Sequence, residues 1–192
     1  MAQRMARRGI VEDPPLARFL FGNTTMAWVW LVVRVWLGYQ WINAALHKVT
    51  DPAWVQSGLA LKGFWERVIV VPENGRAPIA FDWYRDFIQW LLNTQSYTWF
   101  GKLIAYGELF VGVALVIGAF VGIAAFFGAA MNWNFMMAGT ASTNPLLFTL
   151  AILVILAWKV AGYYGLDYYL LNLLGTPWRP GRVFKRSEAA LA

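Results

Sequence analysis

The most informative residues of this chain are ionisable side chains that lie inside long apolar runs. Glu108 lies near the middle of the run 97–120, which carries only one other charge, Lys102. Arg34 and Lys159 lie within two further apolar runs. A carboxylate at bilayer depth costs at least ~2.5 kcal/mol on insertion scales, so it normally faces a charged partner, a polar cavity or a proton path. These residues are the first candidates for binding or proton chemistry.

The depths of the buried charges predict one ion pair. Arg34 lies roughly 10 Å from the inner end of its run at ~1.5 Å per residue, and a long arginine side chain can reach toward Glu108 in the next run. We therefore expect Arg34 to pair with Glu108. Two interpretations stay open: the pair fixes helix register without further function, or it belongs to a ligand or proton site. Lys159 is expected to extend to the membrane interface, beside Tyr163 and Tyr164.

Other side chains are predicted to accompany Glu108. Asn132 lies at a similar mid-membrane depth, and Trp41 and Trp133 lie deep enough to line a pocket for a flat ring. The competing interpretations are interhelical hydrogen bonding for Asn132 and interfacial anchoring for Lys48. The candidate binding residues are therefore Arg34, Trp41, Lys48, Glu108, Asn132 and Trp133, with Glu108 as the candidate catalytic group.

The composition predicts the elements that must position these residues. The 192 residues are 59% hydrophobic and 14% charged, whereas soluble domains average about 25% charged residues. Four segments approach or exceed the ~18–20 residues that a spanning helix needs: 26–46, 98–120, 121–138 and 146–164. We expect an all-α, integral membrane four-helix bundle that forms one domain, with the lipid bilayer as its surroundings.

The rare residue types exclude several kinds of chemistry. The chain has no cysteine, which excludes disulfides, thiol catalysis, iron–sulfur clusters and cysteine-ligated metals. Its one histidine, His47, excludes bis-histidine haem within a single chain. We expect no metal site and no intrinsic cofactor, so any redox chemistry would need a partner.

The distribution of basic residues predicts the topology. The net charge is +6, yet no cluster marks a nucleic-acid-binding element, and we expect no nucleic-acid partner. Residues 1–25 form a basic arm and residues 165–192 a basic tail, so the positive-inside rule places both termini in the cytoplasm. The loop 47–97, with five basic and five acidic residues, would lie outside. No cleavable signal peptide is expected, because the first apolar run is too distant from the start.

The outer loop is expected to hold two helices. The first covers residues 54–71 and ends at Pro72. The second covers residues 83–92, with Asp82 as its N-cap and with Trp83, Phe87, Trp90 and Leu91 on one face. This amphipathic cap would lie either in the outer membrane interface or over the mouth of the bundle.

Small residues at helical spacing predict which faces of the spans meet. Small side chains let helix backbones approach closely in lipid, where packing and hydrogen bonds drive association. The expected contact face of the first span carries Gly38 and Ala45. The expected faces of the second and third spans are Gly101, Ala105, Glu108, Gly112 and Leu115, and Ala125, Gly128, Asn132 and Met136.

Several short segments resemble the DoxX family of membrane proteins, including its DoxD branch, the small membrane subunit of thiosulfate:quinone oxidoreductase. They are Arg34-Val-Trp-Leu-Gly38, Ala45-Leu-His-Lys48, the stretch from Gly107-Glu108 to Gly118, and Met131-Asn132. The resemblance covers approximately residues 29–48 and 100–164. Two features depart from it: Ala119 and Phe120 follow the second span where relatives often carry a basic residue, and the outer segment 51–95 is long.

The resemblance implies a bacterial cell-membrane subunit associated with a redox enzyme and with quinone. Catalysis would then require electrons from a partner, and a quinone or a lipid is the expected bound molecule. In such a site Trp41 and Trp133 would flank the quinone ring, and Glu108 or Lys48 would bond its oxygens. The alternative is a non-catalytic accessory subunit of a larger respiratory or photosynthetic membrane complex, bound to other subunits or to copies of itself. A small transporter is the weaker expectation, because the sequence shows no inverted repeat.

Overall fold

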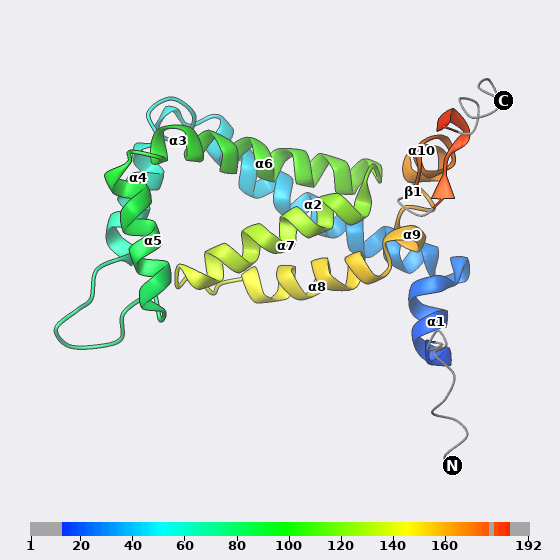
Figure 1. Ribbon diagram of the computed structural model, residues 1–192, viewed down its shortest axis with the longest axis horizontal. Coiled ribbons are helices and arrows are strands. Elements are labelled where there is room, and N and C mark those ends of the chain that lie inside the picture. Colours follow the sequence, from blue (N-terminus) through cyan, green and yellow to red (C-terminus); the bar gives the residue numbers. More distant parts are fainter. Residues whose placement is uncertain (1–12, 177–178, 185–192) are drawn as a thin grey trace, which may run out of the picture.

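The computed structural model describes residues 13–176 and 179–184, and helices make up most of this part of the chain (Figure 1). The only strands within it are β1 (Gly175–Thr176) and β2 (Arg179–Pro180), which form a short antiparallel pair. The expected all-α fold class is therefore confirmed. The basic residues Arg4, Arg7, Arg8, Lys185 and Arg186 of the predicted arm and tail lie outside the described residues.

Four helices lie side by side and form the body of the protein (Figure 1). They are α2 (Ala27–Val49), α6 (Tyr97–Ile117), α7 (Val121–Met137) and α8 (Asn144–Leu156). Helix α2 packs on α6, α6 on α7, α7 on α8, and α8 on α2. Their inward-facing apolar side chains form one core, which includes Leu37, Trp41, Leu115, Ala125, Ala151 and Val154.

Glycines bring α2 and α6 into close contact. A Cβ atom added at Gly38 would lie 2.7 Å from the carbonyl oxygen of Gly112, and one added at Gly112 would lie 2.8 Å from that of Gly38. Neither position accepts a side chain without separating the helices. Both residues belong to the contact faces predicted from the sequence, and the face from Gly101 to Leu115 on α6 is buried throughout. The prediction of these faces is confirmed.

Three helices close one end of the bundle: α3 (Pro52–Val55), α4 (Leu59–Val68) and α5 (Asp82–Asn93). Figure 1 shows α4 and α5 running across the bundle axis at this end. The single helix predicted for residues 54–71 is wrong, because the chain turns at Gly58 (φ +72°), where a Cβ would lie 2.1 Å from the Tyr97 carbonyl oxygen. A second apolar core, which includes Leu61, Trp65, Ile79, Ile88 and Leu91, joins these helices to the bundle.

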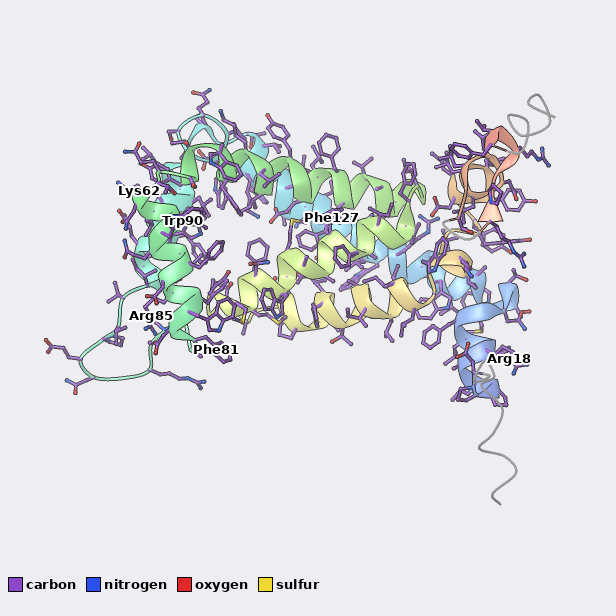
Figure 2. The ribbon with its side chains drawn as sticks, viewed as in Figure 1. Arg18, Lys62, Phe81, Arg85, Trp90 and Phe127 are labelled. Atoms are coloured by element: carbon purple, nitrogen blue, oxygen red, sulfur yellow. The ribbon has the colours of Figure 1, made fainter. Side chains whose placement is uncertain are left out.

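Helix α5 begins differently from the expectation. Phe81 is its N-cap and Asp82 its first residue, so the predicted capping role of Asp82 is wrong. The Asp82 carboxylate instead pairs with Arg85 at 2.6 Å, a residue labelled in Figure 2.

The predicted aromatic face of α5 is divided between the interior and the surface. Tyr84, Ile88 and Leu91 face the interior. Trp83 and Trp90, each 57% exposed, lie on the surface together with Phe87. The predicted aromatic face therefore points outward, apart from Leu91. The Tyr84 hydroxyl donates to the backbone carbonyl and the side-chain oxygen of Asn134 at 3.2 Å each, which joins the cap to α7.

The opposite end of the bundle carries α1 (Pro15–Gly22), the 3₁₀ turn η2 (Thr24–Met26), α9 (Trp158–Ala161) and α10 (Asp167–Leu174) (Figure 1). The expected fourth span is divided at Ala157 into α8 and α9. Helix α1 packs against α9 and is bent away from η2 and α2 by 56°. We call this the inner end and the α4–α5 end the outer end, after the predicted topology.

One helix of the described chain is by itself long and apolar enough to span a membrane. Helix α6 has 21 residues and a mean hydropathy of 1.8 over its most apolar window. The bent pair Pro15–Gly22 and Thr24–Val49 passes the same criteria only if it is taken as one span. Helices α7 and α8 are apolar but shorter, with 17 and 13 residues.

Candidate functional site

The buried carboxylate of Glu108 pairs with Lys48 and not with Arg34. The Lys48 Nζ atom donates to Glu108 Oε2 at 2.6 Å. Glu108 is 1% exposed, whereas the lysine side chain is 20% exposed and its ammonium lies over the Trp54 ring. The predicted Arg34–Glu108 pair is therefore wrong.

The helix register explains why the lysine is the partner. The close contact of Gly38 with Gly112 fixes how antiparallel α2 and α6 are aligned. This alignment places Arg34 beside Val116, which is eight residues and about 12 Å along α6 from Glu108. Lys48 lies toward the other end of α2, and its long side chain reaches back to the carboxylate. Depth estimated from each helix end could not resolve this difference.

Glu108 and two other buried side chains of the bundle carry polar atoms without a hydrogen-bond partner in the described chain. They are Oε1 of Glu108, Nε1 of Trp41, and both Oδ1 and Nδ2 of Asn132. Glu108 and Asn132 are almost completely inaccessible, and Trp41 is 3% exposed. Native proteins leave few buried polar atoms unpaired, because each costs about 1–3 kcal/mol. Such atoms on three adjacent helices are the most unusual feature of the interior.

Packing around Gly128 brings these side chains to one level of the bundle. A Cβ at Gly128 would lie 3.1 Å from Trp41 Nε1 and 3.3 Å from a methyl carbon of Val111. Asn132 is one helical turn beyond Gly128 on α7, and Glu108 is three residues before Val111 on α6, on the same side of each helix. We call Trp41, Lys48, Glu108 and Asn132 the polar centre.

Trp133 does not belong to this centre. It follows Asn132 by one residue, and the turn of about 100° per residue directs it away from the core. Its ring is 43% exposed and makes an edge contact with Tyr84, with 6.4 Å between centroids. The predicted arrangement in which Trp41 and Trp133 flank one flat ring is therefore wrong. Within the described residues the Asn132 side chain makes none of the interhelical hydrogen bonds considered for it, whereas the nearby Asn134 side chain accepts one from the Tyr84 hydroxyl.

Arg34 joins the ends of two helices at the inner end. Its guanidinium donates to the Leu115 and Val116 carbonyl oxygens near the C-terminus of α6, and to those of Ala161 and Tyr164 at and after the end of α9. Carbonyls at helix C-termini have no intrahelical partner and carry partial negative charge. An arginine at this place supplies both the missing hydrogen bonds and an opposing positive charge. Arg34 is 1% exposed, and this set of bonds indicates a structural role.

Sequence reasoning missed Asp167. Its carboxylate accepts hydrogen bonds from the backbone N–H groups of Phe120 at 2.6 Å and Val121 at 2.8 Å, and so caps the N-terminus of α7 from a distant segment. Burial raises the pKa of the Asp167 carboxyl, whereas the N–H groups of Val121 and Phe120 and the Arg34 charge oppose this rise. The one available signal was a lone acid in the tyrosine- and leucine-rich stretch after the last apolar run.

The remaining candidate, Lys159, is exposed on α9 at the inner end. Its ammonium lies 5.5 Å from the centroid of the Trp158 ring. It lies at the opposite end of the bundle from the Lys48–Glu108 pair. Within the described residues, no group of three or more histidine, aspartate or glutamate side chains is placed to hold a metal ion.

No family model, no curated protein and no solved structure matches the chain.

Proposed function

We propose that this chain is a DoxX-like, four-span integral membrane subunit of a quinone-linked redox complex, with both termini in the cytoplasm. In this proposal the polar centre binds the headgroup of a quinone, and a partner protein supplies the electrons. The observation that carries the proposal is the set of unpaired polar atoms on Trp41, Glu108 and Asn132, next to the Lys48–Glu108 pair.

The outer surface of the bundle supports a membrane location. Large apolar side chains project from helices whose other faces are already buried, among them Trp28 at 63% exposure and Phe110 at 71%. Soluble monomers rarely expose such contiguous apolar surface. Further exposed apolar side chains of the bundle helices are Val32, Leu103, Ile123, Phe126, Phe127 and Leu156. Figure 2 shows side chains, among them the labelled Phe127, projecting outward from these helices.

The chemistry of the polar centre supports a carbonyl-bearing ligand. The indole N–H of Trp41 and the amide N–H₂ of Asn132 can each donate a hydrogen bond to a quinone carbonyl oxygen. The free oxygen of Glu108 can accept the hydroxyl of the reduced ring, and Lys48 holds the other oxygen of that carboxylate. When bound, a quinone would supply two-electron redox chemistry accompanied by proton uptake. The residues would orient the headgroup, and Glu108 would hold or release a proton.

The alternative function is a non-catalytic accessory subunit, and one observation favours it. Trp83 and Trp90 on α5 are exposed, and Phe87 lies between them with its ring 6.1 Å from that of Trp90. Exposed aromatic residues of this kind serve either at a membrane interface or in contacts with another subunit. In this alternative the polar centre only maintains helix register.

A substitution at Asn132 should separate these two functions. Asn132→Leu removes two unpaired polar atoms from an apolar interior, so we expect the purified protein to be at least as stable as the wild type. Under the proposed function it should lose most of its co-purifying quinone, because a donor to the ring is gone. Quinone extracted per mole of protein, measured by chromatography, together with the melting temperature, gives both results.

Two matched variants complete this experiment. Glu108→Ala should also lose the quinone when it folds, whereas Lys159→Ala should keep it, because Lys159 lies at the other end of the bundle. Wild-type quinone content in a folded Asn132→Leu protein would reject the quinone site and leave the accessory function.

The proposed topology can be tested directly, because the chain contains no native cysteine. A cysteine placed at Gly75, in the outer loop, should react with an impermeant maleimide in intact cells. A cysteine placed at Arg182 should react only after the membrane is opened. Labelling of both positions from outside would contradict the four-span topology with cytoplasmic termini.

A further inference from the structure

A hollow of about 430 Å³ at the inner end is lined by three basic side chains: Lys159, Arg179 and Arg182. They come from α9, from β2 and from the segment that follows it. The described residues that line this hollow include no carboxylate. Three positive charges around one concave surface favour an anion, and the hollow shares no residue with the polar centre. We call it the basic hollow.

The short strand pair creates the basic hollow by folding the chain back over α10. Thr176 pairs with Arg179 and Gly175 with Pro180, and the Gly181 N–H donates to the Leu174 carbonyl oxygen at 3.2 Å. Gly175 has φ +87°, and a Cβ on it would lie 2.3 Å from the Arg179 carbonyl oxygen. The turn therefore requires glycine, and it brings Arg179 and Arg182 to the same hollow as Lys159.

Polar groups in the basic hollow match a phosphate group. Arginine binds phosphate oxygens through a planar pair of N–H donors, and lysine adds a point charge. The Thr176 hydroxyl, which also lines the hollow, is buried without a hydrogen-bond partner in the described chain. The C-terminus of α10 contributes only about half a negative charge, which the charges of Arg179 and Arg182 outweigh.

We propose that the basic hollow binds the phosphate of an anionic phospholipid headgroup in the cytoplasmic leaflet. This assignment to a lipid depends on the proposed membrane topology, which places the inner end at the leaflet that attracts basic segments most strongly. A free phosphate compound would use the same groups, so the experiment must separate these two sources.

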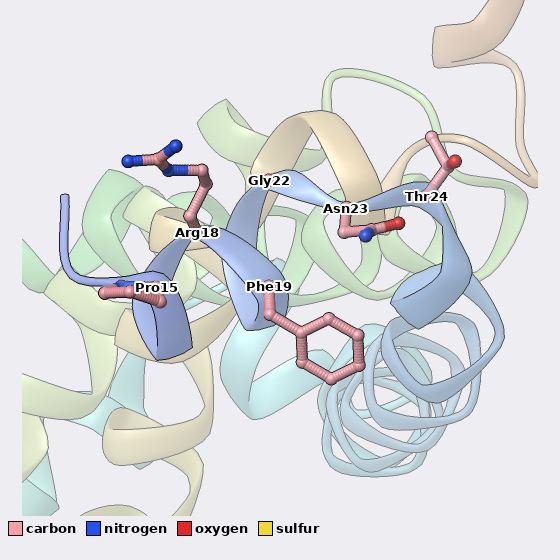
Figure 3. A pocket seen from close by; sticks show the side chains of 6 residues that line it. All are labelled: Pro15, Arg18, Phe19, Gly22, Asn23 and Thr24. Carbon is pink, nitrogen blue, oxygen red and sulfur yellow. The ribbon is translucent and has the colours of Figure 1, made fainter. Parts of the chain in front are cut away.

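A second hollow at the same end supports the choice by contrast. It lies between α1 and η2 and has a volume of about 510 Å³, and Arg18 is the one charged residue among the described residues that line it. Figure 3 shows Arg18 and Phe19, which both line this hollow, projecting to different sides of α1. The basic hollow is the better anion site because its cations surround one space.

The test uses the full-length protein in detergent and measures binding of phosphatidylglycerol, with phosphatidylcholine as the neutral lipid. The double variant Arg179→Gln, Arg182→Gln should bind phosphatidylglycerol roughly tenfold or more weakly than the wild type. The matched control Arg67→Gln, Arg76→Gln removes the same charge near the outer end and should change binding less than about twofold, since surface charges at that distance are screened. Phosphatidylcholine should bind weakly to all three proteins.

Equal phosphatidylglycerol binding by the two double variants would overturn the site. Inorganic phosphate and glycerol 3-phosphate form the second arm: if either binds the wild type as tightly as the lipid does, the lipid source is rejected. Quinone content is measured in the same preparations. Unchanged lipid binding by the Arg179→Gln, Arg182→Gln variant together with quinone loss in Asn132→Leu would show that the lipid site alone has failed. The opposite pattern would show that the quinone site alone has failed.

Discussion

Replacing Lys48 with methionine while Glu108 is kept should lower the free energy of unfolding by about 3 kcal/mol. The substitution leaves a carboxylate that is 1% exposed without its only hydrogen-bond partner in the described chain. For a chain of this length such a loss lowers the melting temperature by roughly 6 °C or more. Thermal unfolding of the purified protein in detergent, followed by tryptophan fluorescence, measures the effect.

A double variant and a surface control make this prediction specific. Lys48→Met combined with Glu108→Gln should recover part of the loss, because no unpaired charge remains. Lys62→Met breaks the exposed pair with Glu66, whose N–O distance is 3.6 Å, and should cost less than about 1 kcal/mol. Additive effects of Lys48→Met and Glu108→Gln would show that the two residues do not interact. In the corresponding cycle of Arg34→Met and Glu108→Gln, the two losses of unfolding free energy should be additive, because these side chains do not touch.

The second large effect is expected at the inner end, where Arg34 joins α6 to α9. Arg34→Met should cost at least about 3 kcal/mol, because four carbonyl oxygens lose a charged donor. Arg34→Lys should recover little, since an ammonium cannot reproduce the planar fork of the guanidinium. Melting temperature and the fraction of protein that is monodisperse after extraction give the measurement.

A glycine pair tests the same contact without changing a charge. Gly118 has φ +72°, and a Cβ on it would lie 2.7 Å from Arg34 Nη2, so Gly118→Ala should be strongly destabilising. Gly107 lies within α6, which ends just before Gly118, and a Cβ on it would meet only the Met131 sulfur at 3.8 Å. Gly107→Ala should be neutral or stabilising, by about 0.5–1 kcal/mol. Equal effects of the two alanines would contradict the role of the Arg34 contacts.

Helix positions and faces were largely predictable from the sequence, because they depend on residues close together in the chain. The apolar runs predicted α2, α6 and α7, and the spacing of glycine and alanine predicted which sides of these helices are buried. The spacing of apolar residues was less informative for α5, where two different faces of the helix could have been the buried one. In α5 the aromatic and aliphatic residues together span more than half of the circumference, so spacing alone could not show that Tyr84 and Ile88 face inward.

Pairing of charges was not predictable, because it depends on the alignment of helices that are distant in sequence. Glu108 was identified because a carboxylate within an apolar run costs free energy, and this argument does not depend on which cation forms the ion pair. The choice of Lys48 over Arg34 was decided by the contact of Gly38 with Gly112, since a shift of two turns would reverse it.

The sequence by itself determined that the chain is helical, that Glu108 is buried, and that Asn132 lies on an inward face, because composition and the helical period set these properties locally. Tertiary structure alone decided the rest. It gave Asp167 the role of capping α7, separated Trp133 from Trp41, and folded Arg179 back toward Lys159. The physical reason is that hydrogen bonds and ion pairs act over a few ångströms, and only the packing of complete helices places residues that far apart in sequence within such a distance.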